Sequence, residues 1–103
     1  MLNDFDRWFR KNESKLNDMR LTVDITGPAS PADKRSIRAD IDTPKYLGRV
    51  TLWDSGECQT EAIDIATEKT VFHTYAVIQS PQDLDRLLKT FISELTSPSP
   101  PTT

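Results

Sequence analysis

The chain has 103 residues, a formal net charge of -3 and an apolar fraction of 36%, values that suit one domain with one hydrophobic core. The negative charge disfavours nucleic acid as a partner, and the short apolar runs predict a cytosolic protein without a signal peptide or membrane span. Cys58 is the only cysteine and His73 the only histidine, which excludes an internal disulfide and a Cys/His site for structural zinc.

The first expected element is a helix over about residues 4–18, with Asn3 as its cap. Its buried face is predicted by apolar residues at helical spacing, which are Phe5, Trp8, Phe9, Leu16 and Met19. Residues 20–26 then alternate between apolar and polar types, as a half-buried strand does, and should end at Gly27. Residues 27–34 show no periodicity, so we expect an exposed, mobile connection there.

Two further one-sided strands are predicted by the same alternation, over residues 36–42 and 46–53. The second ends at Trp53, which has the opposite phase to the core residues of its strand. Asp54, Ser55 and Gly56 follow as a hairpin turn, in which the glycine supplies the left-handed conformation.

A fourth strand is expected over residues 58–65 and a fifth over residues 71–78, which is rich in β-branched and aromatic types. In the fourth strand the sequence does not decide which side chains point toward the core. Thr60 and Ala62 compete for the inward phase with two isoleucines, Ile63 and Ile65. This conflict predicts a bulge near Ala62.

A closing helix is predicted from Ser80, which has the character of a cap and is followed by proline and, at the third position, Asp83. Its apolar stripe consists of Leu84, Leu87, Leu88, Phe91, Ile92 and Leu95. Residues 97–103 contain three prolines and predict a disordered tail, which leaves residues 1–96 as a single domain.

Short connections between the strands favour an antiparallel meander. The predicted fold class is therefore α+β, an antiparallel sheet of about five strands with the N- and C-terminal helices packed on one face. The other face should be open to water. The residues expected on it are Thr22, Asp24, Arg38, Asp40, Arg49, Thr51, Trp53, His73 and Tyr75.

Catalytic chemistry has little support in the sequence. No recognisable motif places a nucleophile beside His73, and Cys58 is best explained as a small buried residue. The three glycines are isolated, each near a strand end or turn, so no phosphate-binding loop is present. We therefore predict a protein that is not an enzyme and needs no cofactor.

A protein partner is favoured instead. Between Arg49 and Lys69 there is no basic residue, whereas five acidic residues produce a negative field that suits a basic partner. Trp53, on the open phase, has the character of an interface anchor, although it could instead fold over its own sheet. The predicted partner-binding residues are Trp53, Asp54, Glu57, Arg49, Tyr75, His73 and Arg38.

One segment of the chain has the sequence Lys45-Tyr-Leu-Gly-Arg-Val-Thr-Leu-Trp-Asp-Ser-Gly-Glu-Cys58. This segment resembles the TriTu family of bacterial immunity proteins. The resemblance continues through Glu61, Ile63 and Asp64 to the strand at 72–75 and the closing helix. It implies an antidote to an ADP-ribosyltransferase toxin that modifies elongation factor Tu and is delivered between competing bacteria by type VI secretion. It also implies inhibition by occlusion, which denies either NAD or the target access to the toxin's cleft.

We expect a monomer that forms a one-to-one heterodimer with the toxin domain. The alternative is a small acidic secretion chaperone, which would need an extended apolar groove or a dimer seam.

Overall fold

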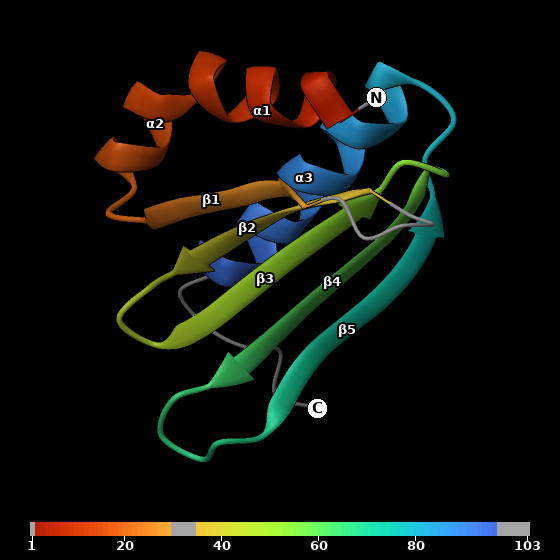
Figure 1. Ribbon diagram of the computed structural model, residues 1–103. Helices are drawn as coiled ribbons and strands as arrows, with labels where there is room; N and C mark the ends of the chain where they lie inside the picture. The colour runs from red at the N-terminus through yellow and green to blue at the C-terminus, as the bar shows by residue number, and fades with distance from the viewer. Residues whose placement is uncertain (1, 30–34, 97–103) are drawn as a thin grey trace.

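A five-stranded antiparallel sheet is covered on one face by the helices (Figure 1). The computed structural model describes residues 2–29 and 35–96; the tail predicted over 97–103 lies outside the described residues. The predicted α+β class, with helices at both ends of the chain and the strands between them, is confirmed. Within the described ranges, no helix has the length and apolar character needed to cross a membrane.

Two helices, α1 (Leu2–Lys11) and α2 (Glu13–Asp18), replace the single N-terminal helix that the sequence predicts. They divide at Asn12, whose backbone N–H and side-chain Nδ2 both donate to the carbonyl of Trp8, at 3.1 and 2.8 Å. The amide side chain thus competes with the backbone for a helical acceptor. The expected cap at Asn3 is wrong, because α1 begins one residue earlier and buries Leu2.

The face predicted for this N-terminal segment is largely correct. Phe5, Phe9 and Leu16 are buried in the core, and Trp8 packs against it. Met19 is 41% exposed, so its assignment to the buried face is wrong. It follows the last residue of α2, where the helical period no longer directs the side chain inward.

The strands pair in chain order, each antiparallel to the next, which confirms the predicted meander. Their bounds are β1 (Thr22–Ala29), β2 (Ser36–Asp42), β3 (Tyr46–Trp53), β4 (Glu57–Asp64) and β5 (Thr70–Val77). On β2, β3 and β4 every second side chain is buried beneath the helices. These inward residues include Ile37, Ala39, Ile41, Tyr46, Val50, Leu52, Cys58, Thr60 and Ala62.

β1 continues past Gly27, where the sequence predicts its end. The pairing with β2 shifts between Thr26 and Ala29, and Gly27 has a φ of 107°, a conformation that glycine adopts without steric cost. A proline is compatible with an edge strand at such an irregularity. The predicted connection over 27–34 is therefore wrong for residues 27–29, and residues 30–34 lie outside the described part.

The pairing shifts beside Ala62, as predicted, but the extra residue is on β5 and not on β4. Ala62 pairs with Phe72, but Ile63 pairs with Thr70, so Val71 is an extra residue on β5. Thr60 and Ala62 take the inward phase, and Ile63 points to the other side of the sheet. β4 itself alternates without interruption, and this regular alternation, not the bulge on β5, places the smaller side chains inward.

α3 (Pro81–Thr96) closes the core and has the predicted start. The N–H of Asp83 donates to Oγ of Ser80 at 3.2 Å, and its carboxylate accepts the N–H of Gln79 at 3.1 Å. The predicted apolar stripe packs on the sheet, with Leu87 only partly buried. Trp8 joins α1 to α3 through a 2.8 Å hydrogen bond from its Nε1 to Asp85.

Candidate functional site

The sheet face opposite the helices, called the open face below, carries the side chains that the sequence predicts for it. Across the strands one row consists of Asp24, Asp40, Arg49, Glu61 and His73, and the next of Thr26, Arg38, Thr51, Gln59 and Tyr75. Trp53 lies at the end of β3 opposite Ser36, and Asp54 follows in the turn. The placement of these residues on one face is confirmed; their role in binding stays a prediction.

An ion-paired group occupies the middle of the open face. Oδ1 of Asp40 is 2.9 Å from Nε of Arg49, and its Oδ2 is 3.4 Å from Nε of Arg38. The two arginine side chains are 47% and 40% exposed, so solvent screens these pairs and their contribution to stability is small. The hydrogen bond to Asp40 fixes the direction of the Arg49 guanidinium, whereas Arg38 makes only the longer ionic contact.

Beside this group lies a shallow hollow of about 420 Å³. Of the described residues that line it, four are acidic and one is basic; the full lining is Asp24, Asp40, Asp42, Leu47, Gly48, Arg49, Glu61 and Ile63. Partial burial raises the pKa of Asp42, and repulsion from Asp40 and Asp24 raises it further, while Arg49 opposes the shift. The hollow therefore favours a cationic group from outside the chain.

The aromatic end of the open face is held by Glu57. Tyr75 Oη donates to its Oε2 at 3.2 Å, and Ser55 Oγ donates to its Oε1 at 3.0 Å. Trp53, half-buried at the end of β3, precedes the turn that contains Ser55. The structure thus brings Glu57 and Tyr75, which are 18 positions apart in the sequence, into direct contact.

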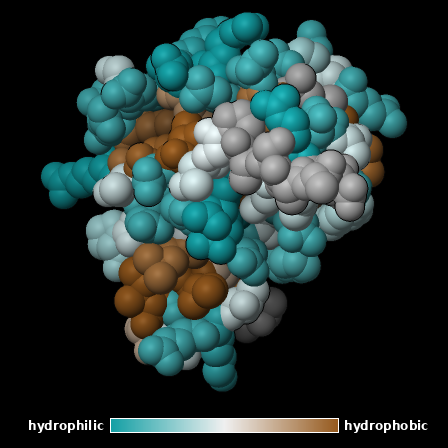
Figure 2. All heavy atoms as spheres, in the orientation of Figure 1, coloured by the Kyte–Doolittle hydropathy of each residue, from teal (hydrophilic) through white to brown (hydrophobic). Residues whose placement is uncertain are grey.

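Sequence reasoning missed an apolar end of the same face. Leu47 is 48% and Ile65 44% exposed, and Ile63 lies opposite Leu47. Figure 2 shows apolar side chains gathered at the lower left, over the start of β3 and the end of β4. The sequence carried a signal for both residues, because Leu47 shares the phase of Arg49 and Ile63 shares the phase of Glu61.

The two residues considered for catalysis have the placements expected of noncatalytic residues. Cys58 is fully buried, and burial raises the pKa of its thiol to about 12, which suppresses the nucleophilic thiolate. His73 is exposed on the open face opposite Glu61. In the part of the chain that the structure describes, no three His, Cys, Asp or Glu side chains are grouped to hold a metal ion.

A sheet covered on one side and exposed on the other, with an acidic hollow between apolar and aromatic ends, defines a small α+β binding protein. The family model described as Immunity protein TriTu matches residues 3–94, so the chain belongs to the TriTu family of immunity proteins. A search of curated proteins found no match. The family is not a class of enzymes, and immunity proteins bind a cognate toxin protein.

Proposed function

We propose that this immunity protein neutralises an antibacterial ADP-ribosyltransferase toxin by placing its open face over the toxin's NAD-binding cleft. It would act in the cytoplasm of the producing cell, as one copy bound to one toxin domain, and would protect elongation factor Tu. The observation that carries the proposal is the acidic hollow of the open face, where Asp24, Asp42 and Glu61 surround a single arginine.

Charge complementarity supports this geometry. A cleft that binds NAD must hold a pyrophosphate, so it presents cationic groups and N–H donors. An acidic surface attracts such a cleft and increases the rate of encounter. Asp40 offsets only one of the two positive charges of Arg38 and Arg49, but the three other carboxylates of the hollow, Asp24, Asp42 and Glu61, still leave it negative.

Specificity would come from the two ends of the face. Trp53 and Tyr75 are large side chains of the type that anchors protein interfaces, and Leu47 with Ile63 supplies apolar surface at the other end. Arg49, oriented by Asp40, and Arg38 can pair with carboxylates of the toxin.

The test uses the purified cognate toxin domain. Trp53→Ala should weaken binding by about 2 kcal/mol or more, roughly thirtyfold in Kd, in calorimetric titration. Met19→Ala removes an exposed apolar side chain on the helix side of the molecule and should leave Kd unchanged. Equal affinity of both variants and the unmodified chain would remove Trp53 from the interface.

A second measurement tests occlusion itself. NAD binding to the toxin should be lost in proportion to the amount of immunity protein added. A complex that still binds NAD but no longer modifies elongation factor Tu would place the block at the target site instead.

A further inference from the structure

The two edges of the sheet differ in how they are protected against another strand. β1 carries Asp24, the Gly27 irregularity and Pro28, all of which hinder pairing at an edge. β5 has the sequence Thr-Val-Phe-His-Thr-Tyr-Ala-Val, with no proline and no Asp, Glu, Lys or Arg. Its bulge lies at the beginning of the strand, so the pairing from Phe72 to Val77 is regular.

The outer side of β5 presents backbone groups for pairing. Ile78 N–H donates to the carbonyl of Gly56 at 2.7 Å, one position beyond the pair of Glu57 and Val77. Hydrogen-bonded and non-hydrogen-bonded pairs alternate in an antiparallel ladder. The N–H and C=O groups of Val77 and His73 therefore point away from β4, and within the described sheet β5 pairs only with β4.

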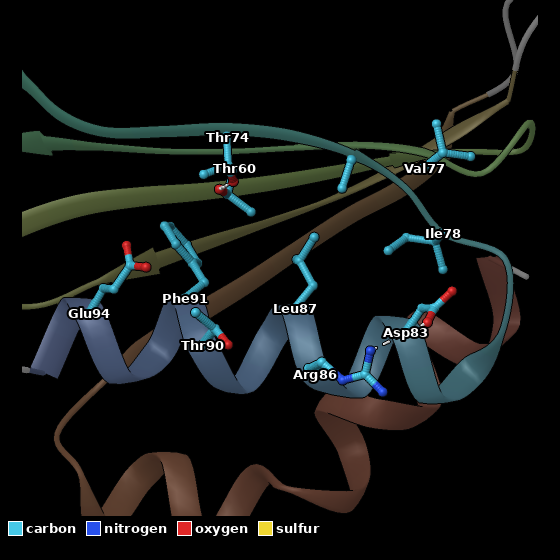
Figure 3. A pocket seen from close by; sticks show the side chains of 11 residues that line it. Thr60, Thr74, Val77, Ile78, Asp83, Arg86, Leu87, Thr90, Phe91 and Glu94 are labelled. Atoms are coloured by element: carbon cyan, nitrogen blue, oxygen red, sulfur yellow. Dashed lines mark hydrogen bonds and ion pairs between the residues drawn. The ribbon is translucent and has the colours of Figure 1, made fainter.

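A groove of about 420 Å³ runs between β5 and α3 (Figure 3). Leu87 and Phe91 rise from the helix into it, and Ile78 closes one end. On the sheet side the hydroxyls of Thr60 and Thr74 bond to each other and so satisfy their polar groups internally. The groove thus offers apolar contacts directly beneath the edge where a further strand would lie.

We propose that an extended segment of the cognate toxin adds to the outer edge of β5 as a sixth strand, with alternate apolar side chains entering the groove above Leu87 and Phe91. The inference rests on the proposed function, which makes the toxin the partner. A toxin segment is favoured over a second copy of the chain because β5 already contributes His73 and Tyr75 to the open face. An added strand would continue that face without a break.

The test compares two tryptophan substitutions on α3. Thr90 is exposed and lines the groove, whereas Ser93 is exposed and lines a different hollow beside Trp8. Thr90→Trp should fill the groove and weaken toxin binding at least tenfold, and Ser93→Trp should leave it unchanged. Circular dichroism melts of both variants confirm that each is folded.

Hydrogen exchange supplies an independent readout. The amides of His73 and Val77 should exchange rapidly in the isolated chain and become protected in the complex with the toxin, because they gain backbone acceptors.

Three results would overturn the proposal. If Thr90→Trp binds normally and these amides stay unprotected while Trp53→Ala still weakens binding, the open face docks alone and only the strand addition is wrong. If the isolated chain has twice its monomer mass by light scattering with both amides already protected, a second copy occupies the edge. If the toxin does not bind the unmodified chain, the proposed function fails and the inference with it.

Discussion

Gly48→Ala should destabilise the protein through a contact that no sequence pattern shows. Gly48 is the third residue of β3, near the strand end as the sequence predicts, and its inward side faces Leu95 of α3. A Cβ added there would lie 2.7 Å from the carbonyl oxygen of Ile41 and 3.0 Å from Cδ1 of Leu95. The glycine is needed because the helix approaches the sheet closely at this position.

The expected change in the free energy of unfolding follows from two opposing effects of the added methyl group. A buried methyl group and the loss of glycine's freedom in the unfolded chain together favour alanine by about 1 to 1.5 kcal/mol. The overlap costs up to about 3 kcal/mol, at the upper end for overpacking, because the Ile41 oxygen belongs to a central strand and cannot move independently. The net loss is about 1.5 to 2 kcal/mol, or roughly 6 to 10 °C in Tm for a domain of this size.

Thermal and urea unfolding followed by circular dichroism measure this loss. Leu95→Ala is the control, because its cost should be about 1 kcal/mol smaller in the Gly48→Ala background, where Leu95 is already strained. If Gly48→Ala unfolds at or above the unmodified temperature, the close approach of α3 to β3 is wrong.

Two further predictions concern titratable groups. Asp42→Asn should stabilise the protein by about 0.5 kcal/mol near neutral pH, because it removes a partly desolvated charge that Asp40 on the same strand and Asp24 on β1 repel. The raised pKa of Asp42 means that the carboxylate takes up a proton in the folded state at a higher pH than in the unfolded state. The stability gain should therefore shrink as pH falls through that raised pKa and vanish below the ordinary pKa of a carboxyl group. Urea unfolding at pH 7 and pH 3 measures the gain, and an equal gain at both pH values would contradict the cause. Cys58 should react with a thiol reagent at pH 8 at least about a hundredfold more slowly in the folded chain than in urea. The reason is that burial raises the pKa of its thiol to about 12. Equal rates in the two states would show that the thiol is accessible.

The open face was predictable because it depends on a local rule. Side chains alternate along a strand, so the phase of Arg38, Arg49 and Tyr75 followed from their neighbours in the sequence. The same rule applied to Asp42 and Leu47, which belong to the face and were not included. Neither residue type by itself indicates a site, because a polar residue at the end of a strand and an exposed leucine each have a simpler structural explanation.

The hollow and the edge groove could not be predicted in this way. The hollow depends on the register between strands, and the groove depends on how far α3 extends beneath the sheet; both are tertiary features. The end of β1 failed for a related reason: glycine and proline usually terminate a strand, but at an irregular sheet edge they are tolerated. Local signals are weakest where pairing with a distant strand decides the conformation.

The positions of the charges on the surface explain the attraction of a basic partner better than the net charge does. A formal charge of -3 spread over 103 residues would produce only a weak field. The sheet register instead places Asp24, Asp40 and Glu61 in one row, with Asp42 close by, although these residues come from three strands. Because the helices cover the opposite side, this acidic row faces solvent, where it can attract a cationic cleft before any close contact is made. In the proposed complex, the meander therefore determines which surface meets the toxin first.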